Sequence, residues 1–143
     1  MPNAIAPAKI LMIEDNEGDI FLLRYALKQQ TPDFELNVLR DGEAALQFIE
    51  DQRCRASEPQ PCVIVLDLHL PKHDGTAILS AIKREPVLSH IHIVALTTLA
   101  SPEDEADILR LGVRMYKTKP TNIDGWHALA SEILDICHEP TLA

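Results

Sequence analysis

The chain has 143 residues, 46% of them hydrophobic, which suits one globular domain and leaves little room for a second. Its formal net charge of −9 argues against nucleic acid as a direct partner, because such binding depends on Lys and Arg side chains that neutralise phosphates. Residues 1–8 are too short and polar for a signal peptide, and no apolar run approaches the roughly 20 residues of a membrane span, so we expect a cytoplasmic protein without a membrane partner.

Segments typical of strands and of helices alternate along the chain. The strand segments are short runs that are apolar or alternate between apolar and polar residues, and the helix segments repeat apolar side chains at helical spacing. In order, they are a strand at 9–13, a helix ending near 30, a strand at 34–39, a helix from 42, a strand at 62–66, a helix at 76–84, a strand at 91–96, a helix at 102–111, a strand at 113–116 and a helix ending near 138.

Several residues mark where these helices begin and end. A polar turn at 16–18 precedes the first helix, and Asp41 and Asp124 are suited to cap the second and the fifth. Ser101 is suited to cap the fourth helix, which has a proline in its first position, and Gly112 supplies its C-terminal stop.

Five successive strand–helix units predict a parallel sheet with helices on both faces. Right-handed crossovers restrict such a chain to doubly wound arrangements, of which the order 2-1-3-4-5 is the natural one for five strands. We therefore expect an α/β fold of flavodoxin-like topology, a doubly wound five-stranded parallel sheet with five helices, in one domain over residues 8–138. The polar connection at 51–61 is long for a link between a helix and a strand.

The apolar run at 63–66 is the centre of this prediction. Its four residues, three of them β-branched, predict a strand buried on both faces. Asp67 follows at once and so lies at the carboxyl end of the strand, the edge where open α/β sheets bind ligands. An aspartate after a strand can also simply begin a turn, so the neighbouring strands have to decide between the two interpretations.

Polar side chains follow the other strands as well. In the order 2-1-3-4-5 the first and third strands are neighbours, so Glu14, Asp15 and Asp67 converge. Three carboxylates repel one another unless a cation is present, and Mg²⁺ resolves this because it takes carboxylate, water and phosphate oxygens. Thr97 and Lys119 follow the fourth and fifth strands, where a hydroxyl and an ammonium suit the oxygens of a phosphoryl group.

This set of residues indicates phosphoryl transfer onto a carboxylate, with the metal and Lys119 balancing charge. Each residue also has a purely structural alternative: a solvated turn for Glu14 and Asp15, a helix cap for Thr97 and a surface position for Lys119. Because all of them lie at one edge of the predicted sheet, the functional interpretation is favoured.

The cysteines and histidines indicate little chemistry of their own. Cys54, Cys62 and Cys137 are odd in number and widely spaced, without a disulfide framework or a zinc spacing, so we expect free thiols. His90 and His92 would share one face of a strand, but no third metal ligand is nearby in the sequence.

Short motifs follow one another at fixed spacing, with 30 residues from Asp67 to Thr97 and 52 from Asp67 to Lys119. The motifs are Glu14-Asp15, Asp41-Gly42-Glu43-Ala44-Ala45-Leu46, Asp67 with Leu70-Pro71 and Asp74-Gly75, Thr97-Thr98 and Lys119-Pro120. In order and spacing they resemble the receiver domain of response regulators in bacterial two-component signalling. The resemblance covers about residues 8–138.

The resemblance implies roles for the acidic residues. Asp67 would be the phosphoacceptor. Glu14 and Asp15 would hold Mg²⁺, together with Asp67 and the backbone carbonyl of His69. In the family, the positions of His69 and Thr98 tune the hydrolysis of the phosphoryl group.

It also implies a switch. Thr97 would bond a phosphoryl oxygen in the active state, Lys119 would pair with the phosphate, and the Lys119–Pro120 peptide bond would be cis. Tyr116, three residues before the lysine, would turn inward when the threonine moves. The fourth helix, fifth strand and fifth helix would form the output surface.

Partners are implied in the same way. A sensor histidine kinase would supply the phosphoryl group. The start at 14–19, the loop at 51–61 and the pair Thr97-Thr98 resemble the small regulators of bacterial phytochrome kinases. No output domain is expected after the last helix, so the output would be an altered surface for a downstream protein.

A homodimer is a further expectation. The helix predicted over 122–138 contains no Lys or Arg, which argues against a dimer joined by salt bridges. An apolar contact through Tyr116 or Trp126 is the alternative, unless Trp126 only packs in the core.

Other functional classes agree less well with the residues. An aspartate-nucleophile phosphatase needs a second acid two residues after the nucleophile, where this chain has His69. A receiver-like module that binds partners without phosphorylation usually lacks one of the acids or the lysine, and all are present here. A flavodoxin-type electron carrier would need a phosphate-binding loop rich in Ser, Thr and Gly after the first strand. We therefore expect a phosphoacceptor signalling protein rather than an enzyme with an external substrate.

Overall fold

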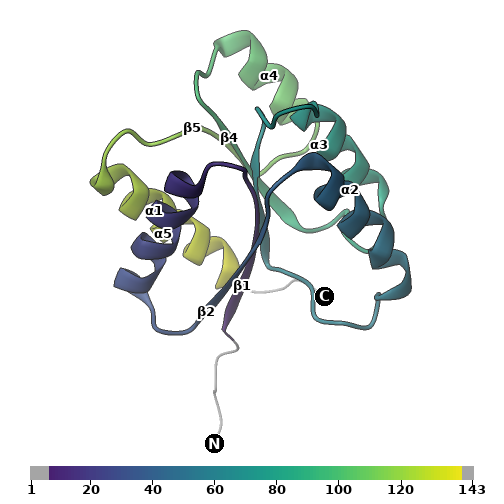
Figure 1. Ribbon diagram of the computed structural model, residues 1–143, viewed down its shortest axis with the longest axis horizontal. Helices are drawn as coiled ribbons and strands as arrows, with labels where there is room; N and C mark the ends of the chain where they lie inside the picture. Colours follow the sequence, from purple (N-terminus) through teal and green to yellow (C-terminus); the bar gives the residue numbers. More distant parts are fainter. Residues whose placement is uncertain (1–6, 140–143) are drawn as a thin grey trace, which may run out of the picture.

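Five parallel strands form a twisted sheet with helices on both faces (Figure 1). The computed structural model describes residues 7–139. The strands are β1 (Ala8–Ile13), β2 (Phe34–Leu39), β3 (Val63–Asp67), β4 (His92–Thr97) and β5 (Met115–Thr118). The helices are α1 (Glu17–Gln30), α2 (Gly42–Asp51), α3 (Gly75–Arg84), α4 (Pro102–Arg110) and α5 (Ile123–Cys137). The strand order β2-β1-β3-β4-β5 confirms the predicted doubly wound topology.

The sheet separates two hydrophobic cores. Val63 and Val65 of β3 point into the core beneath α1 and α5, whereas Ile64 and Leu66 point into the core beneath α2, α3 and α4 (Figure 1). All four side chains are fully buried. Alternate residues of a strand face opposite sides, so a strand with helices on both sides needs an unbroken apolar run. This is why the run at 63–66 predicted the centre of the sheet.

Several predicted helix ends are confirmed. The side chains of Asp41 and Ser101 cap α2 and α4 by accepting backbone N–H groups, and proline opens α4. Gly112 has a φ of +91°, a left-handed conformation that favours glycine just after a helix.

Three of the differences from the predicted boundaries have a clear local cause. Helix α1 begins at Glu17, inside the expected turn at 16–18, because Asn16 caps it. Helix α5 is capped by Asn122 and not by Asp124, which lies in the first turn. Strand β5 begins two residues later than expected, since pairing with β4 starts only at Met115 opposite Val94.

The connection at 51–61 is shorter than predicted. Helix α2 continues to Asp51, and a 3₁₀ turn follows at Gln52–Cys54. The rest of the loop lies against the start of β1, where the ammonium of Lys9 donates to the carbonyl of Pro59 at 3.0 Å. In the part of the chain that the structure describes, none of the helices has the length and apolar character to cross a membrane.

The expectation of three free thiols is wrong for two of them. Cys62, just before β3, and Cys137, the last residue of α5, form a disulfide with a Cα–Cα distance of 5.1 Å, whereas Cys54 is free and exposed. Helix α5 packs along β1 and β3, and this brings its last turn to the start of β3. The sequence separation of 75 positions conceals the pairing in the sequence.

We expect Cys137→Ser to lower the free energy of unfolding by about 2–4 kcal/mol under non-reducing conditions, because the crosslink restricts the unfolded chain. The measurement is urea unfolding followed by the fluorescence of the buried Trp126. Reductant should bring the unmodified chain to the stability of the variant. Cys54→Ser, at the exposed free thiol, is the matched control and should change nothing. Equal stability of the unmodified chain and Cys137→Ser without reductant would contradict the expectation.

Candidate functional site

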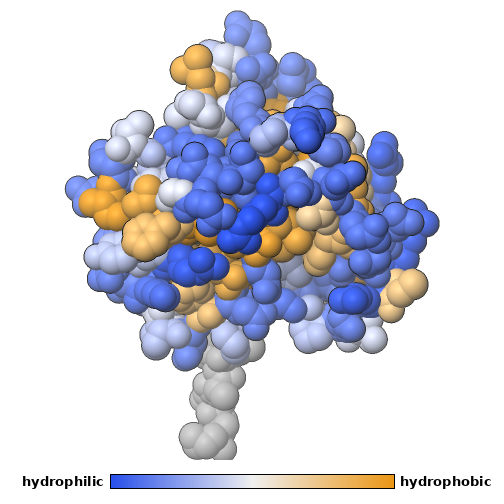
Figure 2. Space-filling view, in the orientation of Figure 1, coloured by the Kyte–Doolittle hydropathy of each residue, from blue (hydrophilic) through white to orange (hydrophobic). Residues whose placement is uncertain are grey.

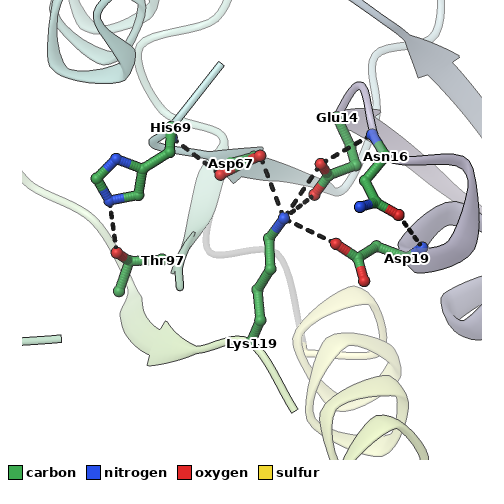
Figure 3. A network of polar contacts seen from close by, with 7 residues as sticks. All are labelled: Glu14, Asn16, Asp19, Asp67, His69, Thr97 and Lys119. Atoms are coloured by element: carbon green, nitrogen blue, oxygen red, sulfur yellow. Dashed lines mark hydrogen bonds and ion pairs between the residues drawn. The ribbon is translucent and has the colours of Figure 1, made fainter. Parts of the chain in front are cut away.

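Four predicted site residues lie side by side at the carboxyl edge of the sheet (Figure 3). Glu14 directly follows β1, Asp67 and Thr97 are the last residues of β3 and β4, and Lys119 directly follows β5. The registers place these strand ends level, with Ile13 opposite Leu66, Asp67 opposite Leu96 and Thr97 opposite Thr118. The sheet therefore brings together residues that are up to 105 positions apart in the sequence.

Lys119 contacts three carboxyl groups at once. Its ammonium donates to Asp19 at 2.8 Å and to Asp67 at 3.2 Å, and it lies 3.0 Å from Oε2 of Glu14. Glu14 and Asp67 are buried, and the side chain of Lys119 is only 14% exposed. The backbone N–H of Lys119 donates to the carbonyl of Thr97 at 2.7 Å, which fixes the start of the side chain beside β4.

Asp19 is the residue that the sequence analysis did not assign to the site. It lies in the first turn of α1, where its backbone N–H donates to the side chain of Asn16 at 3.0 Å. The available signal was the spacing of Asn16 and Asp19, which suits a cap residue and the third residue of a helix. The predicted turn at 16–18 put the start of the helix after residue 18, so Asp19 was not recognised as the third residue of the helix.

The predicted acidic group fits a divalent cation. Carboxylate oxygens of Glu14, Asp15 and Asp67 lie within 4.8 Å of one another. Oε2 of Glu14 is buried and accepts no well-aligned hydrogen bond, so its only charged neighbour among the described contacts is the ammonium of Lys119 at 3.0 Å. A donor set made only of oxygens suits a hard cation. Within residues 7–139 no other group of acids, histidines or cysteines meets the same criterion.

Burial governs the protonation of the group when no metal is bound. The pKa of Glu14 is raised to about 8, first by burial and then by the neighbouring Asp67, whose effect is larger than the lowering by the ammonium of Lys119. For Lys119, burial by itself would lower the pKa, but the hydrogen bonds to Asp19 and Glu14 outweigh it and hold the pKa above the usual lysine value. The lysine therefore stays charged while Glu14 gains a proton near neutral pH.

Thr97 is already hydrogen-bonded through its hydroxyl. Its Oγ1 lies 2.8 Å from Nε2 of His69, and the threonine is buried (Figure 3). The backbone N–H of His69 donates to Oδ1 of Asp67 at 2.9 Å. His69 therefore links the predicted phosphoacceptor to the predicted switch residue, a contact that the sequence did not reveal.

The Lys119–Pro120 peptide bond is trans, which corrects the expected cis bond; residues 7–139 contain no cis bond. Trans is the intrinsically favoured isomer by about 0.5–1 kcal/mol, and the lysine reaches the carboxyl groups with it. Tyr116 is half-buried against the core beneath α3. Trp126 is 1% exposed and packs in the other core, so it is not available for the expected homodimer contact.

Comparison with known families agrees with this arrangement. The family described as "Response regulator receiver domain" matches residues 10–130. The chain belongs to this family and is a response regulator of two-component signal transduction.

Two similar response regulators are matched over most of their length. Response regulator Rcp1 of Synechocystis sp. is 42% identical over 117 residues, which are 82% of this chain and 80% of Rcp1. A crystal structure of the Mn²⁺-bound form of Rcp1 has a TM-score of 0.80 and 38% identity, and covers 96% of this chain and 99% of that one. The phosphorylated cyanobacterial phytochrome response regulator RcpA has a TM-score of 0.79 and 35% identity, with coverages of 91% and 93%.

The raised pKa of Glu14 makes stability depend on pH in the metal-free protein. This pKa is about 8 in the folded chain and 4.5 in the unfolded chain. Between pH 4.5 and 8 the folded state therefore binds more protons than the unfolded state. Stability contributed by Glu14 is therefore lost as the pH rises through this window. We expect Glu14→Gln to remove this slope and to raise the free energy of unfolding near pH 8 by about 1–3 kcal/mol, the usual cost of a buried group with poor partners.

The measurement is urea unfolding with EDTA at a series of pH values. Glu43→Gln, at an exposed acid in the first turn of α2, is the control and should keep the slope of the unmodified chain. An unchanged slope in Glu14→Gln would show that Glu14 does not titrate in this range.

Proposed function

We propose that this receiver accepts a phosphoryl group on Asp67 from a histidine kinase. The observation that carries the proposal is the position of Asp67, buried at the end of the central strand, beside an acidic group that fits a divalent cation and 3.2 Å from the ammonium of Lys119. The metal ligands would be Glu14, Asp15, Asp67 and the backbone carbonyl of His69, and Mg²⁺ is the proposed ion.

The transfer forms a bond between a carboxylate oxygen of Asp67 and phosphorus and breaks the bond from phosphorus to the donor, a histidine nitrogen or the acyl oxygen of acetyl phosphate. Mg²⁺ would supply positive charge for the phosphoryl oxygens. The chain orients both oxygens of Asp67, because the backbone N–H of His69 holds Oδ1 and Lys119 holds Oδ2. Lys119 would then pair with the phosphoryl group.

The switch would begin at Thr97. To donate to a phosphoryl oxygen, its hydroxyl would have to give up its present acceptor, which is Nε2 of His69 at 2.8 Å or the carbonyl oxygen of Leu99 at 3.4 Å, depending on the tautomer of the imidazole. The loop after β4 and the half-buried Tyr116 would repack with it, and the surface of α4, β5 and α5 would change. The output is therefore a surface read by a downstream protein.

Two apolar areas favour protein partners. Phe21 and Tyr25 of α1 are exposed and stack with ring centroids 6.2 Å apart, on the side of the molecule where Figure 2 shows apolar residues in a largely hydrophilic surface. Leu109 and Leu111, in and after α4, and Ile123 of α5 are exposed on the proposed output surface. α5 contains no Lys or Arg, so a homodimer through this surface would be apolar.

The similarity to the phytochrome response regulator RcpA favours a phytochrome kinase as the phosphodonor. We also propose a cytoplasmic receiver domain over residues 8–138 without a direct nucleic-acid or membrane partner, which the net charge of −9 and the lack of a long apolar run in the sequence favour. A receiver-like module independent of phosphorylation is not favoured, since the acids, the threonine and the lysine are all in place.

We expect acetyl phosphate with Mg²⁺ to add one phosphoryl group to the chain. Asp67→Asn should remove the adduct, because its amide is no nucleophile, and EDTA should reduce the rate by at least about two orders of magnitude, as is usual for the loss of a catalytic ion. Intact mass measurement detects the product. Asp74→Asn, at an aspartate of the same loop that only caps α3, is the control and should be phosphorylated normally. An adduct that persists in Asp67→Asn would place the phosphoacceptor elsewhere.

A further inference from the structure

Asp19 is the charged partner of Lys119 that the proposed chemistry leaves unused. The 2.8 Å contact between their charged atoms is the shortest ion pair that the lysine makes. Asp19 does not belong to the group of acids that fits a cation, which consists of Glu14, Asp15 and Asp67. In Figure 3 its carboxylate approaches the ammonium from the side of α1, whereas Glu14 and Asp67 approach from the sheet.

The position of Asp19 is fixed by local hydrogen bonds. Asn16 caps α1 by accepting the backbone N–H of Asp19 at 3.0 Å, and the backbone N–H of Asn16 donates to Oε1 of Glu14 at 3.2 Å. The side chain of Asp19 is only 20% exposed. The carboxylate is therefore held at a set place beside the metal ligands without being one of them.

Lys119 and a divalent cation compete for the same oxygens. Without metal, the ammonium lies 3.0 Å from Glu14 and 3.2 Å from Asp67, two of the three proposed carboxylate ligands. A cation bound there would repel the ammonium, since both are positive and the site is largely buried. Asp19 is the one contact of the lysine that a metal bound by the other acids would leave free.

We propose that Asp19 is a positioning residue for Lys119. When a cation takes Glu14 and Asp67, Asp19 retains the ammonium beside the site, so the lysine gives up the ligands and stays within reach of Asp67. This inference rests on the proposed metal site. It assigns to Asp19 a contribution to cation affinity that acts through Lys119 and not through direct ligation.

The test is a double-mutant cycle with Mn²⁺ alone as the probe, on the full chain without a phosphodonor. The concentration of free Mn²⁺ is measured by electron paramagnetic resonance. We expect Asp19→Asn to weaken Mn²⁺ binding roughly tenfold, because the lysine then stays on Glu14 and Asp67, and Asp19→Glu to restore most of it. In a Lys119→Met background, Asp19→Asn should change the affinity by no more than about threefold, the direct effect of one lost charge.

Asp104→Asn is the matched control. Asp104 occupies the same third position of α4 after the cap Ser101 that Asp19 occupies in α1 after Asn16, and its substitution should leave Mn²⁺ binding unchanged. Thermal unfolding of each variant shows that it is folded.

The other outcomes separate this inference from the proposed function. A loss in Asp19→Asn that is equally large in the Lys119→Met background would mean that Asp19 acts directly on the ion, and would overturn the inference. So would an unchanged affinity in Asp19→Asn, provided that Glu14→Gln weakens binding. If the unmodified chain binds no Mn²⁺ at millimolar concentration, the metal site itself is wrong, and the inference fails with it.

Discussion

The crowding of negative charge at one point of the sheet edge is the constraint on which the site depends. Glu14 and Asp67 are buried next to each other, and burial of like charges is unfavourable unless a countercharge or a proton relieves it. In the metal-free chain both kinds of relief operate: Lys119 contacts the two carboxyl groups, and Glu14 has a pKa near 8. A divalent cation would be a third kind, and it would replace the proton and displace the lysine.

The fold holds the acids and the lysine in this arrangement. The acids cannot separate, because β1 and β3 are hydrogen-bonded neighbours whose side chains pack into both cores. The lysine cannot retreat far, because its own backbone is bonded to Thr97 at the end of β4. The disulfide ties the opposite end of β3 to α5. The sheet thus maintains an unfavourable arrangement of charge that ligands can relieve.

Sequence reasoning succeeded where a single strong pattern determines the structure. The unbroken apolar run at 63–66 requires a strand covered on both sides, and the strand order then places Glu14, Asp67, Thr97 and Lys119 together. It failed where small local differences or distant packing decide. Asn122 and Asp124 are both suited to cap α5, and only the backbone geometry selects the first.

Contacts between residues that are far apart in the sequence could not be predicted either. The pairing of Cys62 with Cys137 depends on how α5 lies along the sheet, which no spacing encodes. The contact of Asp19 with Lys119 joins residues 100 positions apart and depends on the start of α1 at Glu17. The isomer before Pro120 was not predictable either, because the intrinsic preference for trans is only about 0.5–1 kcal/mol.

The contact between His69 and Thr97 bears on how finely the proposed switch is balanced. The hydroxyl of Thr97 already contacts the imidazole of His69 and the carbonyl oxygen of Leu99 in the unphosphorylated chain, so a phosphoryl oxygen would have to replace whichever of the two is its present acceptor. A neutral hydrogen bond contributes about 0.5–1.5 kcal/mol net, and one to a charged group about 1.5–3 kcal/mol. The difference is roughly 1–2 kcal/mol, enough to shift a two-state equilibrium by about one order of magnitude but not to lock it. The threonine alone would therefore only bias the loop after β4. The charge on Lys119 and the repacking of Tyr116 would have to supply the rest of the free energy that favours the active state.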